Sequence, residues 1–115
     1  MAITERLAHL ASLDIQRRYI LHATRDEYLL PEELLDDAHA VVRQIRTQPL
    51  AISAPAVTAI LALQPLLDAV VLPSGRDGLQ HLVEDDTAWR AAREQAVRCL
   101  DILGFDLVAW EHTYK

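Results

Sequence analysis

The stretch that decides the expected fold is residues 3–28, ITERLAHLASLDIQRRYILHATRDEY. One set of its positions, several of them apolar, recurs in alternating steps of four and three residues. The positions in this register are Ile3, Leu7, Leu10, Asp14, Arg17, Leu21, Thr24 and Tyr28. Such a heptad seam predicts one continuous amphipathic helix. At 26 residues the helix would extend for roughly 39 Å. This is long for a domain within 115 residues, so we expect part of the helix to pair with a second chain.

Two polar side chains, Asp14 and Arg17, interrupt this seam. They are three residues apart, which allows them to pair with each other on one helix face. A polar residue in a helical seam often fixes the register or the partner, at some cost in stability. In the alternative interpretation the helix rotates slightly, so that both residues lie at the boundary while Leu13 and Ile20 turn inward.

Residues 29–49, LLPEELLDDAHAVVRQIRTQP, predict a second helix. Pro31 suits the first turn, and Glu32 and Glu33 follow it where negative charge stabilises the helix dipole. The sequence Gln48-Pro49 ends the pattern. One face is apolar and consists of Leu34, Leu35, Ala38, Val41, Val42 and Ile45.

Residues 53–72, SAPAVTAILALQPLLDAVVL, predict a third helix that is apolar nearly all round. Ser53 is a suitable N-cap, Pro55 fits the first turn, and Pro65 should kink or divide the helix. We expect either a central core helix or a helix at a dimer interface. A membrane span would just have the necessary length, but the prolines and the high alanine content disfavour it.

Residues 70–83, VVLPSGRDGLQHLV, are rich in turn formers. Their apolar flanks are compatible with a short hairpin or with a helix–loop–helix connection. We favour the latter, because an isolated two-stranded hairpin is only marginally stable.

The last segment, residues 85–115, predicts a helix capped by Asp85 or Asp86. Gly104 is a candidate C-cap, but Leu107 and Trp110 fall on the same stripe if the helix continues, and continuation is our expectation. The stripe consists of Trp89, Ala92, Ala96, Cys99, Leu100 and Leu103.

The charge balance limits the possible partners. The chain has 17 acidic and 11 basic residues and a net charge of −6, and its only lysine is the last residue. Direct binding of nucleic acid or its phosphates is therefore disfavoured, and a protein with a basic surface is a better match. A single cysteine allows no intrachain disulfide, and the N-terminus has no signal-peptide core. We expect residues 1–115 to form one cytoplasmic helical domain that does not enter a membrane.

One spacing resembles a catalytic signature. Arg17, four residues and His22 are similar to the R-x4-H motif of the HEPN ribonucleases, which are small all-α dimers. The resemblance covers these two residues only. Within a continuous helix, five residues place the two side chains about 140° apart, so they would not face one phosphate together.

The remaining candidates for metal binding or catalysis have a purely structural explanation that we prefer. Three pairs have the helical spacing of metal ligands: His22/Asp26, Asp36/His39 and His81/Asp85. Helical metal sites need such side chains to point into the bundle, whereas Asp36 lies opposite the apolar face of its helix. Cys99 lies on an apolar stripe, where it acts as a small hydrophobic residue. We therefore expect no catalytic residue, no metal and no cofactor.

The sequence predicts an all-α bundle of four to five helices with a long N-terminal helix, forming a homodimer. The predicted function is that of a small acidic regulatory or adaptor protein that binds another protein, as inhibitors, anti-activators, antitoxins and immunity proteins do. The alternative is an enzyme, either a HEPN-like ribonuclease or a metal-binding helical bundle. The residues expected at the partner or dimer interface are Leu7, Leu10, Asp14, Arg17, Leu21, Tyr28 and Trp110.

Overall fold

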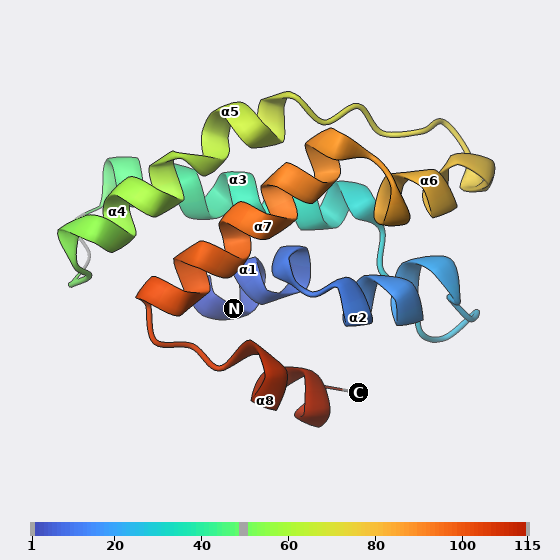
Figure 1. The fold of residues 1–115 in the computed structure, drawn as a ribbon, viewed down its shortest axis with the longest axis horizontal. Helices are drawn as coiled ribbons and strands as arrows, with labels where there is room; N and C mark the ends of the chain where they lie inside the picture. Colours follow the sequence, from blue (N-terminus) through green and yellow to red (C-terminus); the bar gives the residue numbers. More distant parts are fainter. Residues whose placement is uncertain (1, 49–50, 115) are drawn as a thin grey trace.

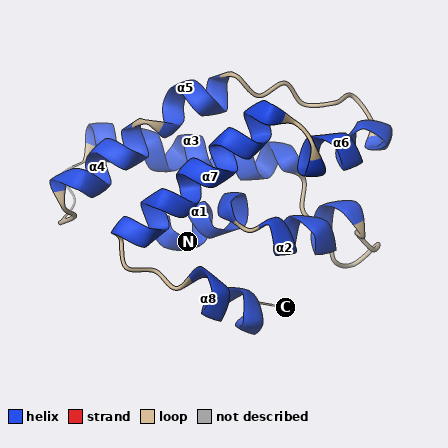
Figure 2. Cartoon of the chain, viewed as in Figure 1, coloured by secondary structure: helices blue, strands red, loops and turns tan. Residues whose placement is uncertain are grey.

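The computed structural model describes residues 2–48 and 51–114, and within these ranges it contains only helices, turns and loops (Figure 2). The all-α prediction is confirmed. The α-helices are α1 (Ile3–Ala11), α2 (Leu13–Gln16), α3 (Pro31–Thr47), α4 (Ala54–Leu61), α5 (Leu63–Asp68), α6 (Leu79–Glu84), α7 (Thr87–Ile102) and α8 (Leu107–Thr113). A π-helical turn (Arg17–Leu21) follows α2, and a 3₁₀ turn (Arg76–Gly78) precedes α6. The expected count of four to five helices is wrong, because three of the expected helices are divided.

The long N-terminal helix is the first of these corrections. Helix α1 ends at Ala11, and the chain passes through Ser12 in an extended conformation (φ −92°, ψ 103°) before α2 begins. The Ser12 hydroxyl accepts a hydrogen bond from the backbone N–H of Ile15 at 3.0 Å. Serine favours this N-cap arrangement over a helix interior, because its side chain offers the backbone a local partner. Helical structure then ends at Leu21, and residues 22–30 form a turn and a loop.

The side chain of Gln16 supplies hydrogen-bond donors to carbonyl groups at the break at Ser12. Its side-chain amide donates hydrogen bonds to the carbonyl oxygens of His9 (3.2 Å) and Leu10 (2.7 Å). These carbonyls belong to the last turn of α1, where helix geometry supplies no partner. The indole N–H of Trp89 on α7 donates to the Gln16 side-chain oxygen at 2.9 Å. Both side chains are fully buried, so the bonds tie the break in the first helix to the last long helix.

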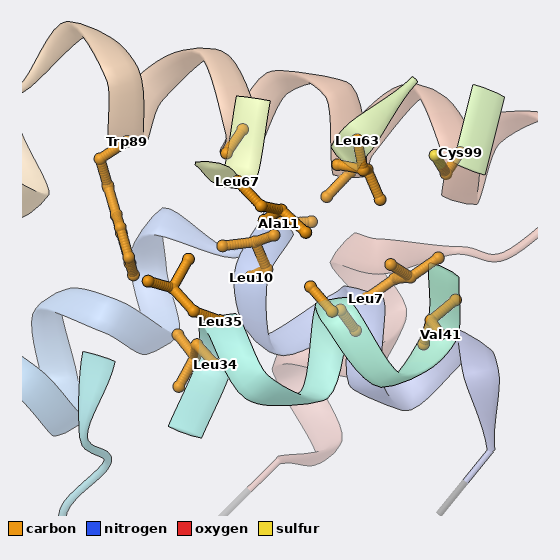
Figure 3. Packing of buried hydrophobic residues seen from close by; sticks show 14 of the residues in the cluster. Leu7, Leu10, Ala11, Leu34, Leu35, Val41, Leu63, Leu67, Trp89 and Cys99 are labelled. Carbon is orange, nitrogen blue, oxygen red and sulfur yellow. The ribbon is translucent and has the colours of Figure 1, made fainter. Parts of the chain in front are cut away.

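The core lies between α1, α3, α5 and α7. Helix α1 packs against α3 and α7, and α5 packs against the same two helices (Figure 1). Leu7 and Leu10 of α1 point into this core beside Leu35 of α3 and Leu63 of α5 (Figure 3). The apolar face predicted for α3 is buried here, except that Ile45 is only partly covered.

Helices α4 and α5 arise from the expected third helix. Ser53 caps α4 by accepting the backbone N–H of Ala56 at 3.2 Å, as predicted. The helix divides at Ala62, because Pro65 has no N–H for the carbonyl of Leu61 and its ring crowds that carbonyl. The prediction of a central core helix is wrong, since α4 and α5 bury one face and expose the other. The exposed positions include Ala54, Pro55, Thr58, Ala62 and Pro65.

Residues 70–83 form the helix–loop–helix connection that we favoured, with a loop, the 3₁₀ turn and then α6. Gly78 is required where this loop folds on itself, because a Cβ atom there would lie 2.4 Å from Cβ of Pro73. Asp86 caps α7 by accepting the backbone N–H of Trp89 at 2.8 Å.

The expected continuation of α7 past Gly104 is wrong. Gly104 adopts a left-handed conformation (φ +74°) that glycine tolerates best. The N–H of Gly104 donates to the carbonyl of Asp101, and that of Phe105 donates to the carbonyl of Leu100. These two bonds form a Schellman motif, which ends the helix. The chain then turns back, and α8 lies beside α1 (Figure 1).

In the part of the chain that the structure describes, no helix combines the length and the apolar character that crossing a membrane requires.

We predict that Gln16→Ala lowers the free energy of unfolding by about 3 kcal/mol or more. The change leaves two carbonyls and the Trp89 indole N–H buried without partners, at about 1–3 kcal/mol for each group. Urea unfolding followed by tryptophan fluorescence measures the loss. Gln80→Ala is the matched control, because Gln80 is exposed on α6, and a similar loss in both variants would contradict the role of Gln16.

Candidate functional site

The residues expected at an interface are dispersed in the structure. Leu7 and Leu10 are fully buried in the core of the chain itself. Leu21 ends the π-helical turn and is partly buried against the same core. Tyr28 lies in the loop of residues 22–30 with 56% of its surface exposed, and Trp110 lies half-buried on α8.

Asp14 and Arg17 do not pair with each other, although their spacing in the sequence allows it. The guanidinium of Arg17 donates two hydrogen bonds to the carboxylate of Glu84 on α6, at 2.6 and 2.7 Å. These bonds lower the pKa of Glu84 and raise that of Arg17. Asp14 lies 3.8 Å from Arg18 instead. His22 is exposed where the π-helical turn ends. Because the guanidinium of Arg17 is held by Glu84, the structure gives no support to the resemblance to an R-x4-H site.

Five of the six aromatic residues gather at the edge of the core, where α8 meets α1 and the π-helical turn. We call this group the aromatic cluster, and it contains Tyr19, Tyr28, Phe105, Trp110 and Tyr114 together with His9. The sixth aromatic residue, Trp89, is buried in the core. The cluster brings together two stretches that are distant in the sequence, residues 9–28 and residues 105–114.

Tyr114 is the centre of the aromatic cluster. Its ring centroid lies 5.2 Å from that of His9, 5.4 Å from that of Tyr19 and 4.9 Å from that of Trp110. The planes of His9 and Tyr19 stand at 81° and 69° to it, which is the edge-to-face geometry that aromatic pairs prefer. Tyr114 thus joins α8 to residues on both sides of the break at Ser12.

Hydrogen bonds fix α8 in this position. His9 Nδ1 donates to the carbonyl of Glu5 at 2.8 Å, because a carbonyl only accepts. In the neutral ring Nε2 is then an acceptor, and the Tyr114 hydroxyl donates to it at 3.1 Å. The Ser12 hydroxyl donates to the carboxylate of Glu111. Burial, with a smaller contribution from Tyr19, raises the pKa of Tyr114.

A hollow of about 190 Å³ opens beside the cluster. Its lining consists of Tyr19, Asp26, Glu27, Tyr28, Leu29 and Tyr114, which include all three tyrosines of the chain. Two backbone bonds hold the loop that forms one side: the N–H of Leu29 donates to the carbonyl of Tyr19 at 2.8 Å, and that of Thr24 donates to the carbonyl of Glu27 at 2.9 Å.

The acidic residues of the hollow have no cationic partner among residues 2–48 and 51–114. The ion pairs in these ranges are Arg17–Glu84 and Arg18–Asp14. The carboxylates of Asp26 and Glu27 therefore add negative charge beside the tyrosine rings. This combination is suited to binding a cationic or amphipathic group.

Sequence reasoning named Tyr28 and Trp110 as interface residues, which stays a prediction, and it did not name Tyr19, Tyr114 or the hollow. The sequence contains one signal that points to Tyr114, because Trp110 and Tyr114 are four residues apart and would share a helix face. It carried no information about Tyr19, whose position depends on the break at Ser12.

A second hollow, of about 230 Å³, lies between the start of α3 and the loop before α6. Leu30, Pro31, Leu72, Pro73 and Leu79 supply much of its lining. Arg76 also lines it and donates to the carbonyl of Ile20 at 3.3 Å, which links this loop to the π-helical turn.

The candidate metal pairs do not assemble into a site. The described residues hold no group of three or more His, Cys, Asp or Glu side chains placed to bind one ion. His22, Asp26, Asp36, His81 and Asp85 are exposed, and His39 is half-buried.

Comparisons of the chain with protein-family models, with curated proteins and with solved structures found no match.

We predict that Cys99 does not react with thiol reagents in the native protein. Its side chain is fully buried on α7, and burial raises its pKa to about 11, so little of the reactive thiolate exists at pH 8. Labelling with a chromogenic disulfide reagent measures the rate. We expect modification only after denaturant is added, and rapid stoichiometric labelling of the folded chain would contradict the burial.

Proposed function

We propose that this chain is a small acidic cytoplasmic protein of regulatory or adaptor type that acts by binding another protein. The observation that carries the proposal is the aromatic cluster with its hollow. Five of the six aromatic residues lie together at the edge of the core, and the hollow that three of them line also contains two carboxylates with no cationic partner in the part of the chain that the structure describes.

Two physical arguments support a protein as the ligand. Tyrosine and tryptophan provide much of the energy at protein–protein interfaces, because they bring large area at low cost in side-chain entropy. The net charge of −6 attracts basic surfaces and repels phosphate backbones. A partner with basic residues around an apolar patch matches both features.

The enzyme alternative has less support. A HEPN-like ribonuclease requires Arg17 to contact a phosphate, but Glu84 holds its guanidinium through two hydrogen bonds. A metal-dependent bundle requires inward-facing ligands, whereas five of the six residues of the candidate pairs are exposed. Binding without catalysis is therefore the function that we propose.

The test is affinity capture with matched variants. We expect the immobilised wild-type chain to recover a stable partner from native extract, and the Asp26→Asn/Tyr28→Ala variant to recover at least about tenfold less. This loss corresponds to about 1.4 kcal/mol of binding energy. Tyr28 is mostly exposed, so its loss should not affect folding.

The control for this experiment is Asp101→Asn/Val71→Ala, which removes one exposed charge and one exposed apolar side chain elsewhere on the surface. Capture should be unchanged in the control. Equal capture by both double variants would contradict a role for the aromatic cluster, and a purified chain with catalytic activity but no partner would contradict the proposed function.

The homodimer stays a prediction. One of its reasons is lost, because the long first helix is broken at Ser12 and its Leu7 and Leu10 are buried within the chain. The other remains, because the outer face of α4 and α5 is uncharged over residues 54–67. Light scattering decides the question: a homodimer gives twice the chain mass of 12.9 kDa, and the single-chain mass at all working concentrations would contradict it.

A further inference from the structure

The shape of the tyrosine hollow limits what it is able to hold. The rings of Tyr19 and Tyr114 meet at 69° with their centroids 5.4 Å apart, so they form two adjoining walls. Pockets for drug-sized molecules usually enclose about 300–1,000 Å³, whereas this hollow measures about 190 Å³. It therefore suits the end of one side chain.

The charge around the hollow selects a cation. Tyrosine rings present a negative face that attracts cations within about 6 Å of the ring centre. Asp26 and Glu27 add two carboxylates that have no cationic partner in the described chain. The neighbouring Arg25 is exposed and is not among the lining residues. An anion would meet repulsion from both the carboxylates and the ring faces.

We propose that this hollow receives an arginine side chain of the partner protein, an inference that rests on the proposed binding function. A guanidinium is planar and weakly hydrated, so it stacks on aromatic rings at a lower desolvation cost than an ammonium group. It also donates two parallel hydrogen bonds to a carboxylate. Both kinds of group line the hollow, and lysine would use them less completely.

The experiment titrates the ¹⁵N-labelled wild-type chain with Nα-acetyl-arginine amide and follows the backbone amide resonances. We expect saturable shifts in residues 26–29, with a dissociation constant on the order of millimolar for one side chain without its protein. The lysine amide should bind several-fold more weakly. The norleucine amide, which has a similar aliphatic stem and no charge, should cause no saturable shift.

Variants separate the contribution of the rings from that of the charge. Tyr28→Leu should weaken binding of the arginine amide by roughly three- to tenfold, while Tyr28→Phe, which keeps the ring, should stay within about twofold of the wild type. Asp26→Asn/Glu27→Gln should weaken binding and reduce its dependence on salt. Asp101→Asn, on the exposed face of α7, should leave the affinity unchanged.

Three results would overturn the inference: no saturable shift with the arginine amide, equal shifts with norleucine amide, or lysine binding as tightly as arginine. The two proposals fail separately. If the aromatic cluster captures a partner but the arginine amide does not bind, only this inference fails. If the arginine amide binds as expected but no partner is captured, the proposed function fails.

Discussion

The hydrogen bonds of Gln16 are the interaction on which the rest of the structure depends. A helix that ends inside a protein leaves carbonyl groups that need donors, and a single side chain supplies them to His9 and Leu10. Because those carbonyl groups have donors, the helix is interrupted at Ser12 while the chain stays in the core. Trp89 links this interruption to α7. A straight helix would have kept its heptad seam for another chain, whereas the broken one buries Leu7 and Leu10 of that seam in its own core and leaves Asp14 and Arg17 exposed.

The break also creates the candidate site. It brings His9 and Tyr19, which lie on either side of Ser12, within reach of one ring on α8. The Schellman motif at Gly104 also contributes, because it turns α8 back towards α1 instead of extending α7. The aromatic residues are thereby separated: Trp89 is in the core, and the other five lie at its edge, where the three tyrosines line a hollow beside two carboxylates that have no cationic partner among the described residues. The proposed binding function follows from this separation.

Local rules predicted much of the fold. The all-α class, the bounds of α3, the cap at Ser53 and the buried stripe of α7 each depend on residues close in the sequence. The same local rules narrow the cap of α7 to Asp85 or Asp86, and the structure shows Asp86. The errors arose where local signals competed. Ser12 is compatible with a helix interior and with a cap, and only a glutamine four residues later and a tryptophan 77 residues away decide between them. The partner of Arg17, Glu84, and the tyrosine hollow depend on long-range contacts that periodicity does not encode.

The most direct test of this account is a nuclear Overhauser measurement on the ring protons of Tyr114. In a continuous first helix, His9 and Tyr19 would lie about 15 Å apart along the axis and on different faces, so one ring would not contact both. The broken helix places both ring centroids within 5.4 Å of that of Tyr114. We therefore predict cross-peaks from Tyr114 to both rings, and cross-peaks to only one of them, or to neither, would contradict the account.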